Sequence, residues 1–178
     1  MQKQQQPFSW PLILSMAIGL AKGMVHLHLH NILHRDLKSL NVLVTSTDPE
    51  EEVTVKLMDF GESEETFQYR EDNHLCGTIR WMAPEIYKGK PYTPKSDVFS
   101  YGIILWELFS LQVPFHEIPR DFQVGDAIAN GQRPSFAPDC LIGYRALAQS
   151  CWDPCPQSRP TFDEALLVLE ELKLRFSS

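Results

Sequence analysis

The chain has 178 residues, of which 43% are hydrophobic and 22% charged, and its net charge is −7. This length suits one domain with a sizeable core, and the composition is typical of a globular protein in water. The acidic balance argues against nucleic acid as a partner, and four cysteines without zinc-ligand spacing favour reduced thiols in the cytoplasm.

The first predicted element is a helix from about Trp10 to about His30, with Ser9 as its cap. Apolar residues recur along it at helical spacing: Ile13, Ala17, Leu20, Met24 and Leu27. An apolar N-terminal stretch can also be a secretory signal, but this stripe continues past any cleavage point and favours a buried helix. No apolar run approaches the ~20 residues of a transmembrane helix, so we expect no membrane span.

Three histidines, His26, His28 and His30, alternate near the end of this helix. A spacing of two residues places neighbouring side chains on different helix faces, which does not favour a metal site. We therefore expect these histidines to be solvated or to cap the end of the helix.

The next stretch concentrates residues that carry chemistry. His34-Arg35-Asp36-Leu37-Lys38-Ser39-Leu40-Asn41 holds an acid, a base and an amide within eight residues, and a second acid follows in Asp59-Phe60-Gly61. Asp36 could accept a proton, and Lys38 is a point charge suited to a phosphate. Asn41 and Asp59 are oxygen ligands suited to Mg²⁺. Base, metal ligands and phosphate clamp are the parts that phosphoryl transfer needs.

Two short strands are predicted between these groups. The short apolar run Val42-Leu43-Val44 is expected to form a buried strand, and Val53, Val55 and Leu57 alternate with polar residues as in a half-buried strand. Residues 47–49 carry a turn signal between them. The resulting hairpin would bring Asn41 and Asp59 together although they are far apart in the sequence.

Residues 59–85 show no clear periodicity and hold hydroxyl groups among acidic side chains. Further helices are expected at 96–110, near 122–130, at 141–152, and after a capping-box pattern at Thr161 to Glu164. The first of these is apolar on most sides, as a central buried helix should be. The apolar face of the last is expected to comprise Phe162, Leu166, Leu169, Leu172 and Phe176.

This order of motifs, closed by Ala83-Pro84-Glu85, resembles the catalytic core of the eukaryotic protein kinase family. The resemblance covers nearly the entire chain, but only the C-terminal lobe of that family. It implies a mainly α fold: the C-terminal lobe of the kinase α+β fold, in which a small β-hairpin carries the catalytic loop.

The resemblance implies a role for each matched residue. Asp36 would be the catalytic base, Lys38 would steady the transferring phosphate of ATP, and Asn41 and Asp59 would bind Mg²⁺. Leu43 would touch the adenine ring, His34 and Phe60 would join a regulatory hydrophobic stack, and Gly61 would complete the Asp-Phe-Gly turn. Asp97 would hold the backbone of His34 and Arg35, and Arg159 would pair with Glu85. Ser63, Thr66 or Tyr69 would carry a phosphate that Arg35 binds.

Two sets of features indicate the branch of the family. Lys38 and Gly77-Thr78 are of the Ser/Thr type, whereas 79–82, Cys151-Trp152 and Arg159-Pro160 resemble tyrosine kinases. This mixture resembles the tyrosine-kinase-like group, whose members mostly phosphorylate Ser and Thr. We expect a Ser or Thr of a protein substrate to be the acceptor, with tyrosine or dual specificity as the alternative.

None of the nine glycines forms Gly-x-Gly-x-x-Gly, and no Val-Ala-Ile-Lys-like strand occurs. The N-terminal lobe or further upstream domains are therefore expected outside these residues, and the chain alone is expected to be inactive. The alternative is a noncatalytic interaction module built on a kinase lobe. The joint presence of Asp36, Lys38, Asn41 and Asp59 favours part of an active enzyme.

Overall fold

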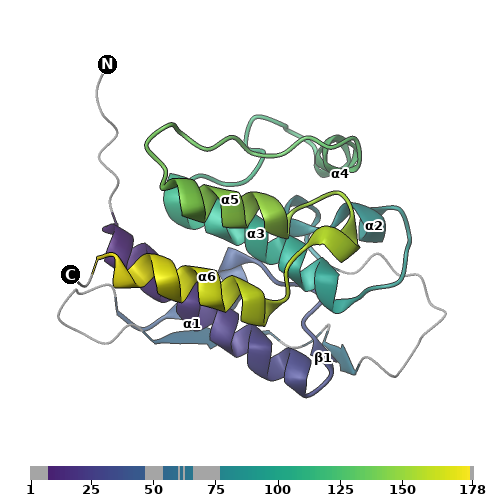
Figure 1. Ribbon diagram of the computed structural model, residues 1–178. Helices are drawn as coiled ribbons and strands as arrows, with labels where there is room; N and C mark the ends of the chain where they lie inside the picture. The colour runs from purple at the N-terminus through teal and green to yellow at the C-terminus, as the bar shows by residue number, and fades with distance from the viewer. Residues whose placement is uncertain (1–7, 47–53, 60, 62, 66–76, 177–178) are drawn as a thin grey trace.

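The computed structural model describes residues 8–46, 54–59, 61, 63–65 and 77–176 (Figure 1). Its helices are α1 (Trp10–Leu29), α2 (Pro84–Tyr87), α3 (Pro94–Ser110), α4 (Asp121–Ala129), α5 (Ile142–Cys151) and α6 (Phe162–Leu174). Its strands are β1 (Ile32–Leu33), β2 (Val42–Val44), β3 (Val55–Leu57) and β4 (Glu64–Glu65), paired antiparallel as β1 with β4 and β2 with β3. The predicted mainly helical fold with a small hairpin is confirmed; the β1–β4 pair was not predicted.

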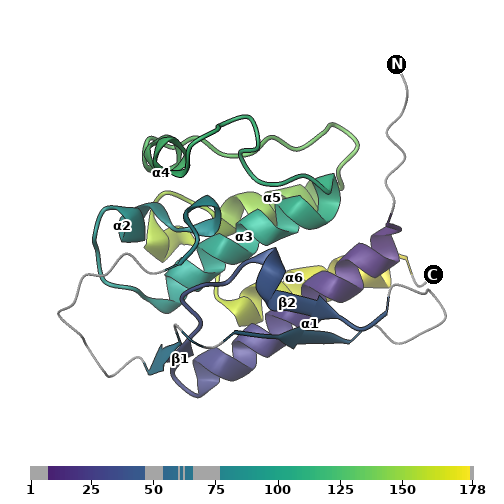
Figure 2. The ribbon, with the colours of Figure 1, turned by 180° about the vertical axis from the view of Figure 1, so that it is seen from behind.

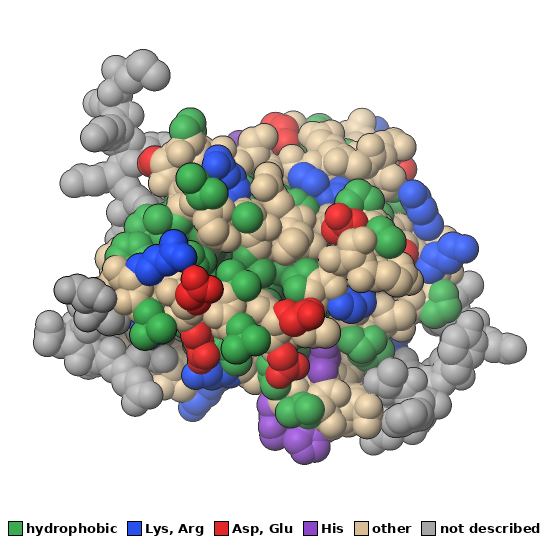
Figure 3. Space-filling view, in the orientation of Figure 1, with side chains coloured by type: hydrophobic (Ala, Val, Ile, Leu, Met, Phe, Trp, Pro, Cys, Tyr) green, Lys and Arg blue, Asp and Glu red, His purple; other side chains and the backbone are tan. Residues whose placement is uncertain are grey.

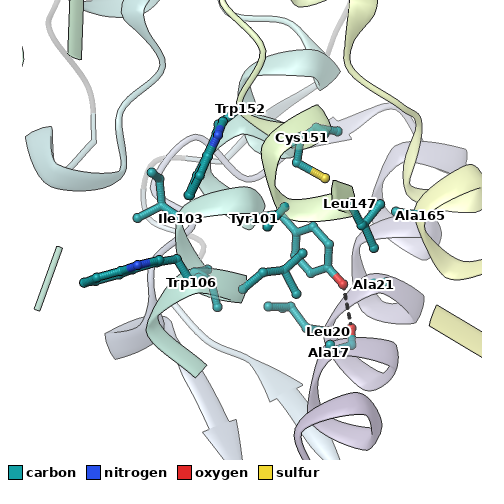
Figure 4. Packing of buried hydrophobic residues seen from close by; sticks show 14 of the residues in the cluster. Ala17, Leu20, Ala21, Tyr101, Ile103, Trp106, Leu147, Cys151, Trp152 and Ala165 are labelled. Carbon is teal, nitrogen blue, oxygen red and sulfur yellow. Dashed lines mark hydrogen bonds between the residues drawn. The ribbon is translucent and has the colours of Figure 1, made fainter. Parts of the chain in front are cut away.

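Helix α3 lies at the centre of the fold, between α5 on one side and the segment that carries β2 on the other (Figures 1 and 2). Phe99, Ile103 and Leu105 have no exposed surface, so the prediction of a central buried helix is correct. Tyr101, also fully buried, donates a hydrogen bond of 2.9 Å to the Ala17 carbonyl of α1 (Figure 4). Helix α3 therefore fixes α1, and with it the start of the loop that follows α1.

Helix α3 begins at Pro94, two residues before the predicted start. The capping residue is Thr93, whose side chain and that of Ser96 form a reciprocal capping box. The sequence did not indicate this cap, because the usual capping-box pattern has Glu or Gln at the third helical position and serine occupies it here. Asp97 consequently lies inside the first turns of the helix, where it is fully buried.

Helix α1 ends one residue before the predicted end, but its cap differs from the expectation. Ser9 stands at the N-cap, yet its side chain makes no capping hydrogen bond. Within the described residues, α1 alone is long and apolar enough to cross a membrane by length and composition, which corrects the expectation that no segment approaches that length. In its most apolar window 56% of the residues are buried, and α6 packs along it, as for a core helix.

Helix α6 opens with the predicted capping box, in which Thr161 and Glu164 exchange hydrogen bonds. Phe162, Leu169 and Leu172 are buried as expected. Phe176 was assigned to the same apolar face, but the helix ends at Leu174 and the Phe176 side chain is 42% exposed.

The β2–β3 hairpin lies directly on α1. Val42 pairs with Leu57, and one further hydrogen bond of 2.9 Å joins the Met58 N–H to the Asn41 carbonyl. A Cβ at Gly19 of α1 would lie 2.7 Å from Val55 Cγ2, so this close approach requires glycine. Val53, predicted as part of the second strand, lies outside the described residues.

Candidate active site

The Asp36 carboxylate is the centre of a compact polar network. Its Oδ1 accepts hydrogen bonds from the Thr78 N–H at 2.8 Å and the Thr78 hydroxyl at 2.9 Å. Its Oδ2 accepts from Lys38 Nζ at 2.5 Å and from Asn41 Nδ2 at 3.3 Å. Partial burial acts to raise the pKa of Asp36, but the bonds from Lys38 and Thr78 outweigh it and the pKa is lowered. The carboxylate is therefore ionised at neutral pH.

Lys38 and Thr78 close the network from two distant segments. Lys38 Nζ also donates to Thr78 Oγ1 at 2.8 Å, so the three side chains bond to one another in a ring. Gly77 makes this approach possible. Its φ is +101°, and a Cβ there would lie 2.7 Å from the Arg35 carbonyl oxygen, so only glycine fits.

The hairpin brings the backbones of the two predicted metal ligands together. Met58, which bonds to the Asn41 carbonyl, immediately precedes Asp59. Asn41 is buried, and both its side-chain hydrogen bonds donate from Nδ2 to Asp36, so Oδ1 accepts none from the described residues. Asp59 is exposed and has a left-handed φ of 59°, which aspartate tolerates better than most residues.

Asp97 holds the turn that precedes Asp36. Its buried carboxylate accepts hydrogen bonds from the backbone N–H groups of His34 at 3.0 Å and Arg35 at 3.1 Å. The Tyr92 hydroxyl donates to it at 3.1 Å. Arg35 has a left-handed φ of 68°, a conformation that costs free energy in a residue with a side chain. The two hydrogen bonds that Asp97 accepts stabilise that conformation and so orient Asp36.

His28 is a further partner of Asp97 that sequence reasoning missed. Its Nε2 lies 3.0 Å from Asp97 Oδ2, and the side chain is only 16% exposed. The expectation of a solvated or capping histidine is therefore wrong for His28. It holds for His30, whose Nδ1 bonds to the His26 carbonyl at 2.8 Å on the exposed end of α1. The alternating spacing placed His28 alone on the inner face, a difference visible only once the direction of α1 is known.

Glu85 and Arg159 form a two-pronged ion pair. Arg159 Nη1 and Nη2 donate to the two Glu85 oxygens at 2.6 Å and 2.8 Å. The remaining donors of Arg159 reach the carbonyls of Asp153 and Lys95, each at 2.8 Å. Arg159 is 1% exposed and the Glu85 side chain 14%, so this largely buried pair fixes the end of the 77–85 segment to the loop before α6.

Glu107 of α3 links two further parts of the site and was not identified from the sequence. It accepts from the Ser39 hydroxyl at 3.0 Å and from Trp81 Nε1 at 2.6 Å. Burial raises its pKa to about 7, against the smaller lowering effects of the bonds from Trp81 and Ser39. One signal was available: a carboxylate inside an apolar helix must have polar partners.

We expect Glu107 to make the free energy of unfolding fall as pH rises from about 4.5 to about 7. In that interval the unfolded chain has released the Glu107 proton whereas the folded chain retains it, so stability decreases with pH. The contribution of Glu107 to the free energy of unfolding is fully present below pH 4.5 and is lost as the pH rises to about 7. It amounts to up to about 3 kcal/mol.

Urea unfolding of the wild type and Glu107→Gln across pH 4–8 measures this effect. The wild type is expected to lose more stability than the variant between the two ends of the range. Glu117→Gln, a substitution at an exposed carboxyl, is the control and should follow the wild type. Parallel profiles for the wild type and Glu107→Gln would contradict the assignment.

The structure places the other predicted residues as follows. Leu43 on β2 is 45% exposed, so the prediction of a buried strand at 42–44 is wrong: the hairpin lies at the surface and covers α1 with one face only. His34 is fully buried. The Gly61 N–H lies 3.3 Å from Asp59 Oδ1, and the Ser63 hydroxyl lies 3.5 Å from the His34 carbonyl. Three predicted residues, Phe60, Thr66 and Tyr69, lie outside the described residues.

Together these groups provide an ionised carboxylate, a lysine beside it, and two oxygen-bearing side chains, Asn41 just before β2 and Asp59 just after β3. No group of three His, Cys, Asp or Glu side chains suited to a metal occurs among the described residues. The arrangement instead suits a cation that takes most of its ligands from a phosphate-bearing substrate.

Residues 1–169 match the family model described as protein tyrosine and serine/threonine kinase. The chain is 35% identical to mitogen-activated protein kinase kinase kinase 12 of Rattus norvegicus over 165 residues, which cover 93% of this chain and 18% of that protein. It is 38% identical to mitogen-activated protein kinase kinase kinase 13 of Homo sapiens over 159 residues, 89% of this chain and 16% of that protein. It is 39% identical to the serine/threonine/tyrosine-protein kinase HT1 of Arabidopsis thaliana over 171 residues, which cover 94% of this chain and 42% of that protein. The chain thus spans less than half the length of these relatives.

Proposed function

The chain belongs to the protein kinase family, and from this membership we propose that it is the C-terminal lobe of an enzyme that transfers the γ-phosphate of ATP to Ser or Thr of a protein substrate. The observation that carries the proposal is the ring of hydrogen bonds among Asp36, Lys38 and Thr78. It unites an ionised acceptor and a phosphate-binding cation at one point, as phosphoryl transfer requires.

Asp36 would accept and orient the hydroxyl group of the substrate. Its two oxygens already receive four hydrogen bonds, about as many as a carboxylate accepts. An incoming hydroxyl must therefore displace one donor. Lys38, on the most flexible side chain, is the donor best able to move, and its displaced ammonium group would then bind the transferring phosphate.

Asn41 and Asp59 fit Mg²⁺ by their chemistry. Asn41 Oδ1 accepts no hydrogen bond from the described residues, and the exposed Asp59 carboxylate is open to a ligand. Asn41 Oδ1 and the Asp59 carboxylate would hold the cation together with oxygens of the nucleotide. When bound, the cation would supply positive charge that neutralises the phosphates.

We place the N-terminal lobe, which would cover the nucleotide, outside these 178 residues. Three apolar side chains on or beside the hairpin support a docking face there: Leu40 is 74%, Leu43 45% and Met58 41% exposed. A cytoplasmic location agrees with the free thiols of the described cysteines Cys140, Cys151 and Cys155. The name of the Arabidopsis relative includes tyrosine, so dual specificity is retained as the alternative.

We also propose that phosphate in the 59–85 segment regulates the enzyme through Arg35. Among the described hydroxyls of that segment, Ser63 supports this idea because it lies beside the loop that carries Arg35. A phosphate adds charge-assisted hydrogen bonds to an arginine and can order a loop. Thr66 and Tyr69 are the other candidates. Full activity of protein shown by mass spectrometry to lack phosphate would argue against this regulation.

The test of the proposed function compares these 178 residues alone with the same residues joined to the N-terminal lobe of a related kinase. Transfer from labelled ATP to peptides containing Ser, Thr or Tyr is measured. The joined protein should turn over at about 1–100 per second on Ser or Thr. The 178 residues alone should be at least about 1,000-fold slower, because positioning of the nucleotide is lost.

Asp59→Ala in the joined protein is the control for metal-dependent transfer and should be inactive. Robust turnover by the 178 residues alone, abolished by Asp59→Ala, would contradict the need for a second lobe. A joined protein that binds nucleotide but transfers no phosphate would contradict the proposed activity and favour an interaction module.

A further inference from the structure

A basic hollow is lined by residues of α5 and of the segment after α4. Figures 1 and 2 show α5 on one side of α3 and the segment that carries β2, next to the candidate active site, on the other. The hollow has a volume of about 630 Å³ and is lined by residues 133–136, after α4, and by Arg145, Gln149 and Trp152. The last three follow at helical spacing on one face of α5 and its C-cap. The volume falls within the range of sites that hold a drug-sized ligand or a short peptide segment.

The hollow is positively charged although the chain has a net charge of −7. None of the residues that line it is acidic. Figure 3 shows both basic and acidic side chains over the upper half of this face, and a group of acidic ones lower, over α6. An anion inside the hollow therefore meets two arginines, Arg133 and Arg145, and no carboxylate among the lining residues.

Arg133 supplies positive charge to the hollow, but few of its N–H groups are left to bind a ligand. Its guanidinium donates to the backbone carbonyls of Ile128 at 3.0 Å, Gln132 at 2.7 Å and Trp152 at 3.1 Å, and it lies over the Phe99 ring at 4.9 Å. These acceptors are neutral, and Nη2 is buried without a partner among the described residues. Burial, followed by the nearby charge of Arg159, lowers the pKa of Arg133 to about 10, so it stays charged near neutral pH.

Acidic side chains near the hollow are already engaged elsewhere. Glu85 and Asp153 are the carboxylates whose charges act on Arg133. Glu85 is bound by Arg159 in the two-pronged pair, and Asp153 Oδ1 accepts from the Cys155 N–H at 2.7 Å. Neither lines the hollow. Among the described residues neither carboxylate forms an ion pair with Arg133, whose hydrogen bonds all go to neutral carbonyls.

Arg145 is the donor that a ligand could reach. Its side chain is half-buried and makes no hydrogen bond or ion pair with any residue in the described part of the chain. Gln149, one turn further along α5, adds an exposed amide, and the exposed residue Ser135 lines the same space. Phe136 and Trp152, whose ring centroids are 5.7 Å apart, provide an apolar wall beside these polar groups.

We propose that this hollow binds an acidic peptide segment of a partner protein, with an Asp or Glu carboxylate on Arg145 and a neighbouring apolar residue against Phe136. One accessible guanidinium matches one carboxylate through two parallel hydrogen bonds. A phosphate dianion is a poorer match, because the donors of Arg133 are held by carbonyls or buried. The site lies apart from Asp36, so the proposal concerns docking and does not depend on phosphate transfer.

The test uses the full chain, labelled with ¹⁵N, and three blocked peptides: acetyl-Gly-Phe-Glu-Phe-Gly-amide and its Gln and phosphoserine counterparts. Binding is followed through the indole N–H signal that Trp152→Phe removes. The Glu peptide should shift this signal in a saturable way, at least about tenfold more tightly than the Gln peptide. Equal binding of the Gln peptide, tighter binding of the phosphoserine peptide, or no saturable shift would overturn the proposal.

Substitutions at the exposed face of α5 separate docking from folding. Arg145→Gln should weaken the Glu peptide about tenfold, and Arg145→Lys should weaken it less, since it keeps the charge but loses the paired donors. Arg175→Gln, which changes an arginine 68% exposed on α6, should leave binding unchanged. Arg145→Gln that keeps wild-type affinity would overturn the proposal, and unchanged backbone signals elsewhere would show that the variants are folded.

Discussion

Replacing Asp36 with asparagine is expected to lower phosphate transfer by the two-lobe protein about 10²–10⁴-fold, with nucleotide affinity nearly unchanged. Asparagine preserves the size of the side chain, and its oxygen can still accept from Thr78. It loses the negative charge that we propose orients the substrate hydroxyl, and that holds Lys38 at 2.5 Å. Nucleotide contacts depend mainly on other groups, so binding and turnover should separate.

Calorimetry with ATP and a transfer assay measure the two quantities independently. Asp163→Asn, at an exposed acid in the first turn of α6, is the matched control and should change neither. Near-normal turnover in Asp36→Asn would remove Asp36 from the role of base. A parallel loss of nucleotide affinity would mean that Asp36 supports the nucleotide pocket itself.

Breaking the pair between Glu85 and Arg159 is expected to have the largest effect on stability. Arg159→Met leaves the Glu85 carboxylate without its partner in a site where Arg159 was 1% exposed. Removal of one partner of a buried pair costs roughly 3–5 kcal/mol, because a charge remains buried and unpaired. Urea unfolding of the chain gives this value directly.

Two further variants test the cause of that loss. Glu85→Leu combined with Arg159→Met removes both charges and should recover part of the stability, because the penalty belongs to the unpaired charge. Arg175→Met breaks the exposed pair with Glu171 and should cost no more than about 0.5 kcal/mol. If Arg159→Met cost as little as Arg175→Met, the pair would not stabilise the fold as described.

The sequence predicted those parts of the site whose chemistry is contained in short motifs. Asp36, Lys38 and Asn41 lie within six residues, and a hairpin was sufficient to bring Asp59 beside them. The central position of α3 followed from its apolar character on most sides. These features depend on local sequence, and the structure shows the elements within a few residues of their expected positions.

The missed contacts join segments whose relative position no local pattern encodes. His28 and Asp97 are 69 residues apart, and Ser39 and Glu107 are 68 apart. Whether a polar side chain on an apolar helix faces water or a distant partner depends on the rotation of that helix in the core. Gly19 was unremarkable in sequence for the same reason, since its role exists only where Val55 crosses it.

The contact between the hairpin and α1 limits how far the predicted metal ligands, Asn41 and Asp59, can move relative to each other. Because Gly19 has no side chain, Val55 rests on the backbone of α1, and no rotatable group lies between the two surfaces at that point. Backbone atoms of a buried helix fluctuate less than side chains that change rotamer. Asn41 and Asp59 thus share one stiff support, and thermal motion should displace them together. The distance between the backbones of these two residues should therefore stay nearly constant while the support itself moves. This matters because a small cation such as Mg²⁺ accepts little variation in the distances to its ligands.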